Sequence, residues 1–224
     1  MKKYTFIIFF FLTYYLSFSQ TDSLTYYYNK GEIDKAITYG KNIITYYENN
    51  NLNNSENYII GLEWLLNLSL QKNDLAQSEI YCIKLQNNLD ESRNNQISLI
   101  NSYYLIATFY FKKENYKQSK EHLKKGINIC KNNKIEDVSL FYLVNLLNVI
   151  EVESEILPTN ETIINLNLQL ALSEKIFKKN SYEYFVAIGK IASYYMKIED
   201  IKNAEEYILK TLDIAESLYG KTND

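Results

Sequence analysis

Residues that could perform chemistry are few in this sequence and stand far apart. The chain has one histidine, His122, and two cysteines, Cys82 and Cys130. A cysteine nucleophile needs a base such as histidine within hydrogen-bonding reach. The repeat register described below brings neither cysteine to His122, which is expected on a solvated helix face among lysines. In an oxidising compartment the cysteines could pair. They fall in different helical runs, however, which favours two buried, small, apolar side chains.

Carboxylates and glycines provide no further candidate site. Glu151, Glu153 and Glu155 are spaced by two residues, so they cannot share one helix face and hold a metal ion together. The six glycines occur singly, so the sequence contains no phosphate-cradling loop. We therefore expect no catalytic, cofactor-binding or metal-binding residue, no cofactor and no enzymatic activity.

The composition indicates a folded, helical protein. Hydrophobic residues make up 46% of the chain and charged residues 23%, as in ordinary globular domains. One proline and six glycines in 224 residues argue against a sheet-rich fold, because such folds use these residues at their many turns. Long helices with short polar connections are the expected elements.

The first residues have a different composition. Lys2 and Lys3 precede an apolar run over residues 4–16, and small residues follow at Ser17 and Ser19. This is the layout of a bacterial secretory signal peptide, and the run is shorter than the roughly 20 apolar residues that span a membrane. We expect removal of residues 1–19 and export to the periplasm or medium, with a retained membrane anchor as the alternative.

The net charge bears on the class of partner. Removing two lysines from a chain of formal charge −3 leaves −3 − 2 = −5. A mildly acidic protein gains nothing from electrostatic attraction to polyanions, so nucleic acid is not an expected partner. No membrane contact is expected after signal cleavage either, unless a region beyond residue 224 supplies an anchor.

Residues 103–127 show the pattern on which the rest of the chain is built. Apolar and small residues recur at helix spacing on both sides of a polar corner at residues 112–115; they are Tyr103, Ile106, Ala107 and Tyr110 before it, and Tyr116, Ser119, Leu123 and Ile127 after it. Two helices buried on one side only cannot cover their own apolar stripes, so such a pair needs a similar pair beside it.

The pattern recurs at a constant interval. The small residue that opens each second helix falls at Ala36, Ser78, Ser119 and Ala204, with intervals of 42, 41 and 85 residues. The last interval is twice 42.5, which indicates a solenoid that tolerates one irregular repeat. Small residues at the start of each second helix predict that the two helices of a pair approach closely there.

These positions resemble the tetratricopeptide repeat (TPR) family, in its longer-period, kinesin-light-chain-like variety, which is also common in bacterial scaffold proteins. The matching residues are Ile106, Ala107, Tyr110, Tyr116, Ser119, Leu123 and Gly126, then Gly31, Ile33 and Ala36, and then Ile191, Ala192, Tyr195, Ile201, Ala204 and Ile208. The resemblance implies an all-α, right-handed α-α superhelix of about five helix pairs over residues 20–224. Its repeats are expected at about 21–50, 57–90, 98–133, 137–179 and 181–219.

The resemblance also implies a peptide-binding groove along the first helices of the pairs. The positions that face it by register, here called the groove candidates, are Trp64, Asn67, Tyr104, Thr108, Phe111, Lys112, Ser193, Met196 and Lys197. Glu63, Tyr104 and Gly189 stand where chaperone-binding relatives carry a carboxylate-binding lysine, so that type of clamp is not expected. Lys112, Lys190 and Lys197 could still attract an acidic peptide. The 22 tyrosines are expected mainly in packing, and in part along the groove.

The sequence thus predicts an exported, non-enzymatic scaffold that binds a peptide or protein on the concave face of a TPR solenoid. An alternative is that the chain is the amino-terminal sensing or scaffold part of a longer protein. Its effector would then lie beyond residue 224, as a membrane-anchored signalling domain or a caspase-like, CHAT-type peptidase. A small apolar ligand held between helices is a third option.

Overall fold

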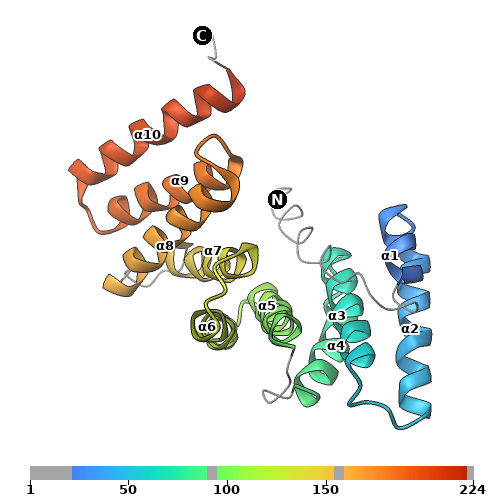
Figure 1. The fold of residues 1–224 in the computed structure, drawn as a ribbon. Coiled ribbons are helices and arrows are strands. Elements are labelled where there is room, and N and C mark those ends of the chain that lie inside the picture. The colour runs from blue at the N-terminus through green and yellow to red at the C-terminus, as the bar shows by residue number, and fades with distance from the viewer. Residues whose placement is uncertain (1–21, 90–94, 154–158, 221–224) are drawn as a thin grey trace. The chain divides into compact units, whose positions relative to one another are not determined.

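The computed structural model describes residues 22–89, 95–153 and 159–220, and these residues form ten helices (Figure 1). They are α1 (Asp22–Asn29), α2 (Ile33–Asn49), α3 (Glu56–Gln71), α4 (Leu75–Asn87), α5 (Gln96–Lys112), α6 (Tyr116–Asn132), α7 (Val138–Glu153), α8 (Asn160–Phe177), α9 (Tyr182–Lys197) and α10 (Ile201–Tyr219). The predicted all-α fold of helix pairs is confirmed. The predicted signal peptide, residues 1–19, lies outside the described residues, as does Glu155.

The chain divides into two compact units, residues 1–129 and residues 130–224, here called unit 1 and unit 2. Within unit 1, α2 packs on α1 and α3, while α3 and α4 both contact α5. Within unit 2, α8 packs on α7 and α9, and α10 packs on α9. Each unit is therefore a stack of helices that are neighbours in sequence. The single repeat domain expected over residues 20–224 stays a prediction.

The small residues that open the second helices are buried where two paired helices meet. Ala36, Ser78 and Ser119 are fully buried, and Ala204 is nearly so. The Ser119 hydroxyl donates to the Ala107 carbonyl at 2.8 Å, across the pair formed by α5 and α6. The predicted close approach is confirmed, and a larger side chain at these positions would overpack the contact.

A left-handed residue forms the corner between the two helices in four of the pairs. The residues are Gly31, Asn73, Glu114 and Glu199, with φ of 73°, 57°, 58° and 62°. Their intervals are again 42, 41 and 85 residues (73 − 31, 114 − 73, 199 − 114). In each corner, backbone N–H groups turn back to the carbonyls that the first helix leaves unpaired, as Asn115 does to Tyr110 at 2.9 Å.

In three of these four pairs the residue after the left-handed one caps the second helix with its side chain, whereas Glu32, after Gly31, makes no such bond. Asp74, Asn115 and Asp200 each accept a hydrogen bond from the backbone N–H three residues later, at 3.1, 3.2 and 3.2 Å. Short polar side chains at this position satisfy an N–H group that has no partner inside the helix. In these polar corners two consecutive residues therefore have separate roles. The left-handed residue ends the first helix, and the residue after it caps the second.

Ion pairs join one repeat to the next in one case, and α8 to the loop before α7 in another. Lys84 of α4 binds Glu48 of α2 at 2.7 Å, and Lys175 of α8 binds Glu136 at 3.0 Å. The Glu48 carboxylate also accepts from the Tyr58 hydroxyl at 2.9 Å. Such half-exposed pairs contribute little each, on the order of 0–1 kcal/mol. They connect side chains that lie 36 and 39 residues apart, close to one repeat.

The corner geometry generates a prediction about stability. We expect Glu114→Gly to raise the free energy of unfolding by about 1 kcal/mol, because glycine adopts a left-handed backbone without strain. Gly31→Ala should lower it by about the same amount. No atom lies within 4 Å of a Cβ added at Gly31, so that loss would come from the backbone alone. Urea unfolding followed by circular dichroism measures both changes.

Lys113→Gly is the matched control, because Lys113 precedes Glu114 and has an ordinary φ of −84°. Glycine there should lower the stability, since it adds conformational freedom to the unfolded chain and removes the exposed Lys113–Glu79 ion pair. An equal response of the two adjacent positions would contradict the assignment of strain to Glu114.

Candidate functional site

The groove candidates of unit 1 lie on α3 and α5, and most of them are buried. Trp64, Asn67, Tyr104 and Thr108 are 3%, 2%, 4% and 8% exposed. The Trp64 ring packs edge-on against Tyr28 with ring centroids 5.3 Å apart. Their assignment to a peptide groove stays a prediction, and any partner there would meet side chains already packed among the helices.

Phe111 and Lys112, at the end of α5, are half-buried. The Phe111 ring contacts Tyr116 across the corner, with centroids 5.9 Å apart. In unit 2, Ser193 and Met196 lie on exposed positions of α9, and Met196 is 58% exposed. Of the apolar groove candidates, Phe111 and Met196 are thus the two that a partner could reach without rearranging the core.

The lysines expected to attract an acidic peptide instead bind backbone carbonyls of the preceding first helix. Lys112 Nζ donates to the Leu70 carbonyl near the end of α3 at 2.9 Å. In unit 2, Lys190 Nζ donates to the Asn145 carbonyl at 3.0 Å, and Lys197 Nζ donates to the Val152 carbonyl at 3.1 Å. Burial also lowers the pKa of Lys112.

This placement gives these lysines a structural role. The last carbonyls of a helix have no partner inside it and carry the negative end of the helix dipole, which an ammonium group satisfies. Lys112 and Lys197 meet this need 42 and 45 residues after the carbonyl that they bind. Their charge helps to hold one repeat on the next, so it adds less to the attraction of an acidic ligand than the sequence suggested.

A buried carboxylate lies between α3 and α5 at a position that the sequence reasoning passed over as a missing clamp residue. Glu63 is 4% exposed and accepts hydrogen bonds from the hydroxyls of Ser102 at 2.6 Å and Ser98 at 3.2 Å. Burying a carboxylate is costly unless such partners surround it. The sequence signal for this contact is one acidic residue inside an apolar helix, followed in the next repeat by two serines one helical turn apart.

His122 is not on a solvated face, and that prediction is wrong. Its ring stacks on the ring of Tyr110, with centroids 5.6 Å apart and an interplanar angle of 3°. Its Nε2 lies 3.3 Å from Nε2 of Gln86, a residue of α4. Burial and the nearby Lys125 lower the pKa of His122, while Glu121 raises it to a smaller extent. The ring therefore favours its neutral form.

Cys82 also reaches this cluster, which repeat register alone did not predict. Its thiol donates to Oε1 of Gln86 at 3.7 Å, and the Tyr110 hydroxyl donates to the same atom at 3.3 Å. Gln86 thus contacts both Cys82 and His122. Burial raises the pKa of the Cys82 thiol to about 12. A thiol that stays protonated at neutral pH is a poor nucleophile, so the arrangement serves packing between the second and third repeats.

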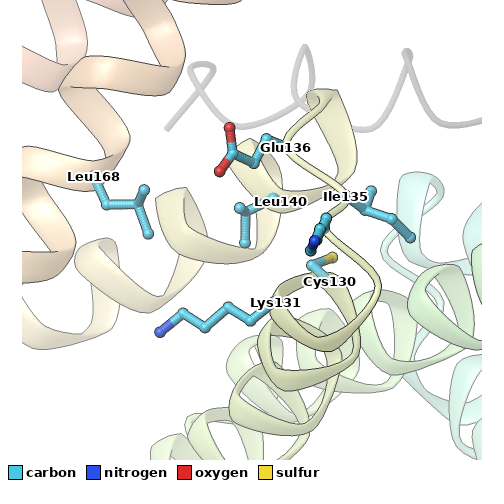
Figure 2. A pocket seen from close by; sticks show the side chains of 7 residues that line it. Cys130, Lys131, Ile135, Glu136, Leu140 and Leu168 are labelled. Carbon is cyan, nitrogen blue, oxygen red and sulfur yellow. The ribbon is translucent and has the colours of Figure 1, made fainter.

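Cys130 is likewise free and buried, as the sequence predicted for both cysteines. It lines a pocket of about 450 Å³ in unit 2, at the loop between α6 and α7 (Figure 2). The other lining residues are Lys131, Lys134, Ile135, Glu136, Leu140 and Leu168. Burial raises the Cys130 pKa to about 12. Its lining combines apolar side chains with charged ones, and Glu136 is already paired with Lys175 at 3.0 Å.

Within residues 22–89, 95–153 and 159–220, no group of three histidine, cysteine, aspartate or glutamate side chains is placed to hold a metal ion. Among the helices given above, none is both long enough and apolar enough to cross a membrane.

The environment of His122 generates a prediction about pH. Because the folded pKa is lowered, the unfolded chain binds the extra proton more readily, and stability decreases as the pH falls. The loss should begin near the unfolded pKa of about 6.5 and continue down to the lower folded pKa. His122→Phe keeps an aromatic ring for stacking and cannot titrate, so its stability should fall less over that range. Equal pH dependence of the two proteins in urea unfolding would contradict the prediction.

Comparisons with known proteins agree with this fold. Residues 100–133 match the tetratricopeptide repeat family model. No curated protein sequence matches the chain. Among solved structures, the nearly identical TPR-like repeats of a Podosopora anserina protein described as a kinesin light chain superpose with TM-scores of 0.70 and, for a form with one substitution, 0.72. Both are 12% identical; the alignments cover 91% and 89% of this chain and 96% and 94% of theirs.

A third structure, BtubC (BKLC) from P. vanneervenii, has a TM-score of 0.65 and 14% identity, and its alignment covers 86% of this chain and 77% of that one. At such identities the likeness concerns the fold. Residues 100–133 are therefore similar to a tetratricopeptide repeat, within an all-α fold like that of kinesin-light-chain-like repeats.

Proposed function

We propose that this chain is an exported scaffold that binds an apolar protein segment along the first helices of its pairs. The TPR-like repeat fold is generally a scaffold for protein–protein interaction. The observation that supports a site on the first helices is the composition of α3 and α5. Every residue from Tyr58 to Leu70 and from Ser98 to Phe109 is buried.

A surface helix normally has a polar side, and a helix that is apolar all round needs cover on every side. The helices α2, α4 and α5 pack on α3. The buried stretches are already covered by neighbouring helices, so a bound apolar protein segment would make contact at the half-buried end of α5, at Phe111. Aromatic side chains such as Trp64 and Tyr104 are typical of the centre of protein interfaces.

The chemistry of the lysines narrows the class of partner. Lys112 and Lys197 already bind carbonyls, so the first helices present little free positive charge from these residues. An acidic peptide is therefore a less suitable ligand than an amphipathic one with aliphatic or aromatic anchors. In unit 1 the half-buried Phe111, and separately in unit 2 the exposed Met196, is an accessible apolar position where such an anchor would make contact.

The proposal predicts the outcome of a peptide selection. We expect a displayed random peptide library to yield amphipathic binders, and Phe111→Glu to weaken them roughly tenfold or more, as the loss of an interface anchor does. Ile83→Glu is the matched control, because Ile83 is a 51% exposed apolar residue on the second helix α4. Circular dichroism checks that both variants fold.

Two results would contradict the proposed binding site on the first helices. One is a selection that returns no specific binders. The other is a set of binders whose affinity responds to Ile83→Glu as strongly as to Phe111→Glu. Binders rich in aspartate and glutamate would favour the acidic-ligand interpretation instead.

The export part of the proposal rests on residues 1–19 and has its own test. When the 224-residue chain is produced in a bacterial host, we expect the extracytoplasmic product to begin at Gln20 or Thr21, because signal peptidases cut after small residues such as Ser19. Mass spectrometry of the amino terminus measures this. An uncut chain in the cytoplasm would contradict export, and an uncut chain in the membrane would favour a retained anchor.

A further inference from the structure

One side of α10 carries a row of exposed apolar residues. Ile201 is 68% exposed, Leu212 55% and Tyr219 68%, and Ile208 is more than a third exposed. Within unit 2, α10 packs against α9, and the two helices lie next to one another in Figure 1. Exposed apolar residues that share one side of a helix, here interrupted only by Glu205, indicate an interaction surface.

The spacing of this row follows a pattern used for pairing helices. The residues Ile201, Glu205, Ile208, Leu212, Ala215 and Tyr219 are separated by alternating steps of four and three. Such a 3.5-residue repeat keeps an apolar seam facing a partner helix along its length. The most suitable occupant is therefore another helix that runs along α10.

We propose that this occupant is the α10 of a second copy, in an antiparallel, two-fold symmetric pair. In one antiparallel register Ile208 of each chain faces Leu212 of the other, and Ile201 faces Tyr219. The same register brings Leu209, which is 55% exposed, close to its own counterpart near the two-fold axis. A two-fold interface must be complementary to itself, and this arrangement satisfies that requirement along the row.

The charges beside the row match the same register. Lys202 of one copy lies near Glu216 of the other, and the pair occurs twice because of the two-fold symmetry. Opposite charges at the flanks of an apolar seam select orientation and partner. A parallel pair would bring the two Lys202 side chains to one level and the two Glu216 side chains to another, which disfavours that orientation. This charge pattern argues for a second copy over an unrelated apolar partner.

The test is the oligomeric state of the purified full chain, measured by sedimentation over a range of concentrations. We expect a reversible equilibrium between one chain and two. Ile208→Lys should weaken dimerisation roughly tenfold or more, because the substituted side chain enters the interface twice. Ile83→Lys, at the similarly exposed position on α4, should leave the equilibrium unchanged. Circular dichroism confirms that each variant is folded.

A charge exchange tests the orientation. Lys202→Glu should weaken the dimer, and Glu216→Lys in the same chain should restore it, because the exchanged pair is again complementary. A chain that stays monomeric at its highest soluble concentration overturns the proposal. So does a dimer that is insensitive to Ile208→Lys, or a series of larger oligomers. The last result would indicate head-to-tail stacking of repeats or of other segments on α10.

Discussion

The fold depends on how closely two helices approach where the second helix of each pair begins. Ala36, Ser78, Ser119 and Ala204 are buried at this level, and none has a side chain larger than a hydroxymethyl group. The left-handed corner that precedes them shares their intervals of 42, 41 and 85 residues. A corner of fixed geometry and a fixed gap between helices set the angle of each pair. Once that angle is set, the apolar sides of neighbouring pairs can pack in the same way along the chain.

Features that are encoded within about twenty consecutive residues could be predicted from the sequence, whereas contacts between repeats could not. Thr162 is a locally encoded position that the sequence pattern nevertheless failed to reveal. It is buried 43 residues after Ser119, in phase with the small residues, but a β-branched side chain concealed that repeat. Lys112 shows the second kind, because it meets the Leu70 carbonyl 42 residues earlier in the chain. A backbone carbonyl has no sequence signal, which is why lysines that end helices were interpreted as ligand-binding charges.

Buried polar groups supply a specificity that the apolar helices lack. In unit 2 the Asn148 amide donates to Gln169 at 2.8 Å, and Gln169 donates to Asn145 at 2.7 Å. Lys190 also donates to Asn145 at 2.7 Å, so the chain of bonds runs from α8 through α7 to α9. Apolar surfaces tolerate sliding by a turn, whereas a shift here would leave several buried amides without partners. In unit 1, Glu63 connects α3 to two serines of α5 in the same manner.

This use of polar groups affects how the protein can recognise others. Lysine, glutamate and amide side chains on the first helices are committed to register between repeats, so they are less available to a ligand. In the proposed function, recognition on these helices depends mainly on apolar shape, as at Phe111 and Met196. On α10, by contrast, the charged residues Lys202 and Glu216 lie beside an exposed apolar row. In the two proposed interactions, α10 selects its partner by charge pattern, while the first helices select by apolar fit.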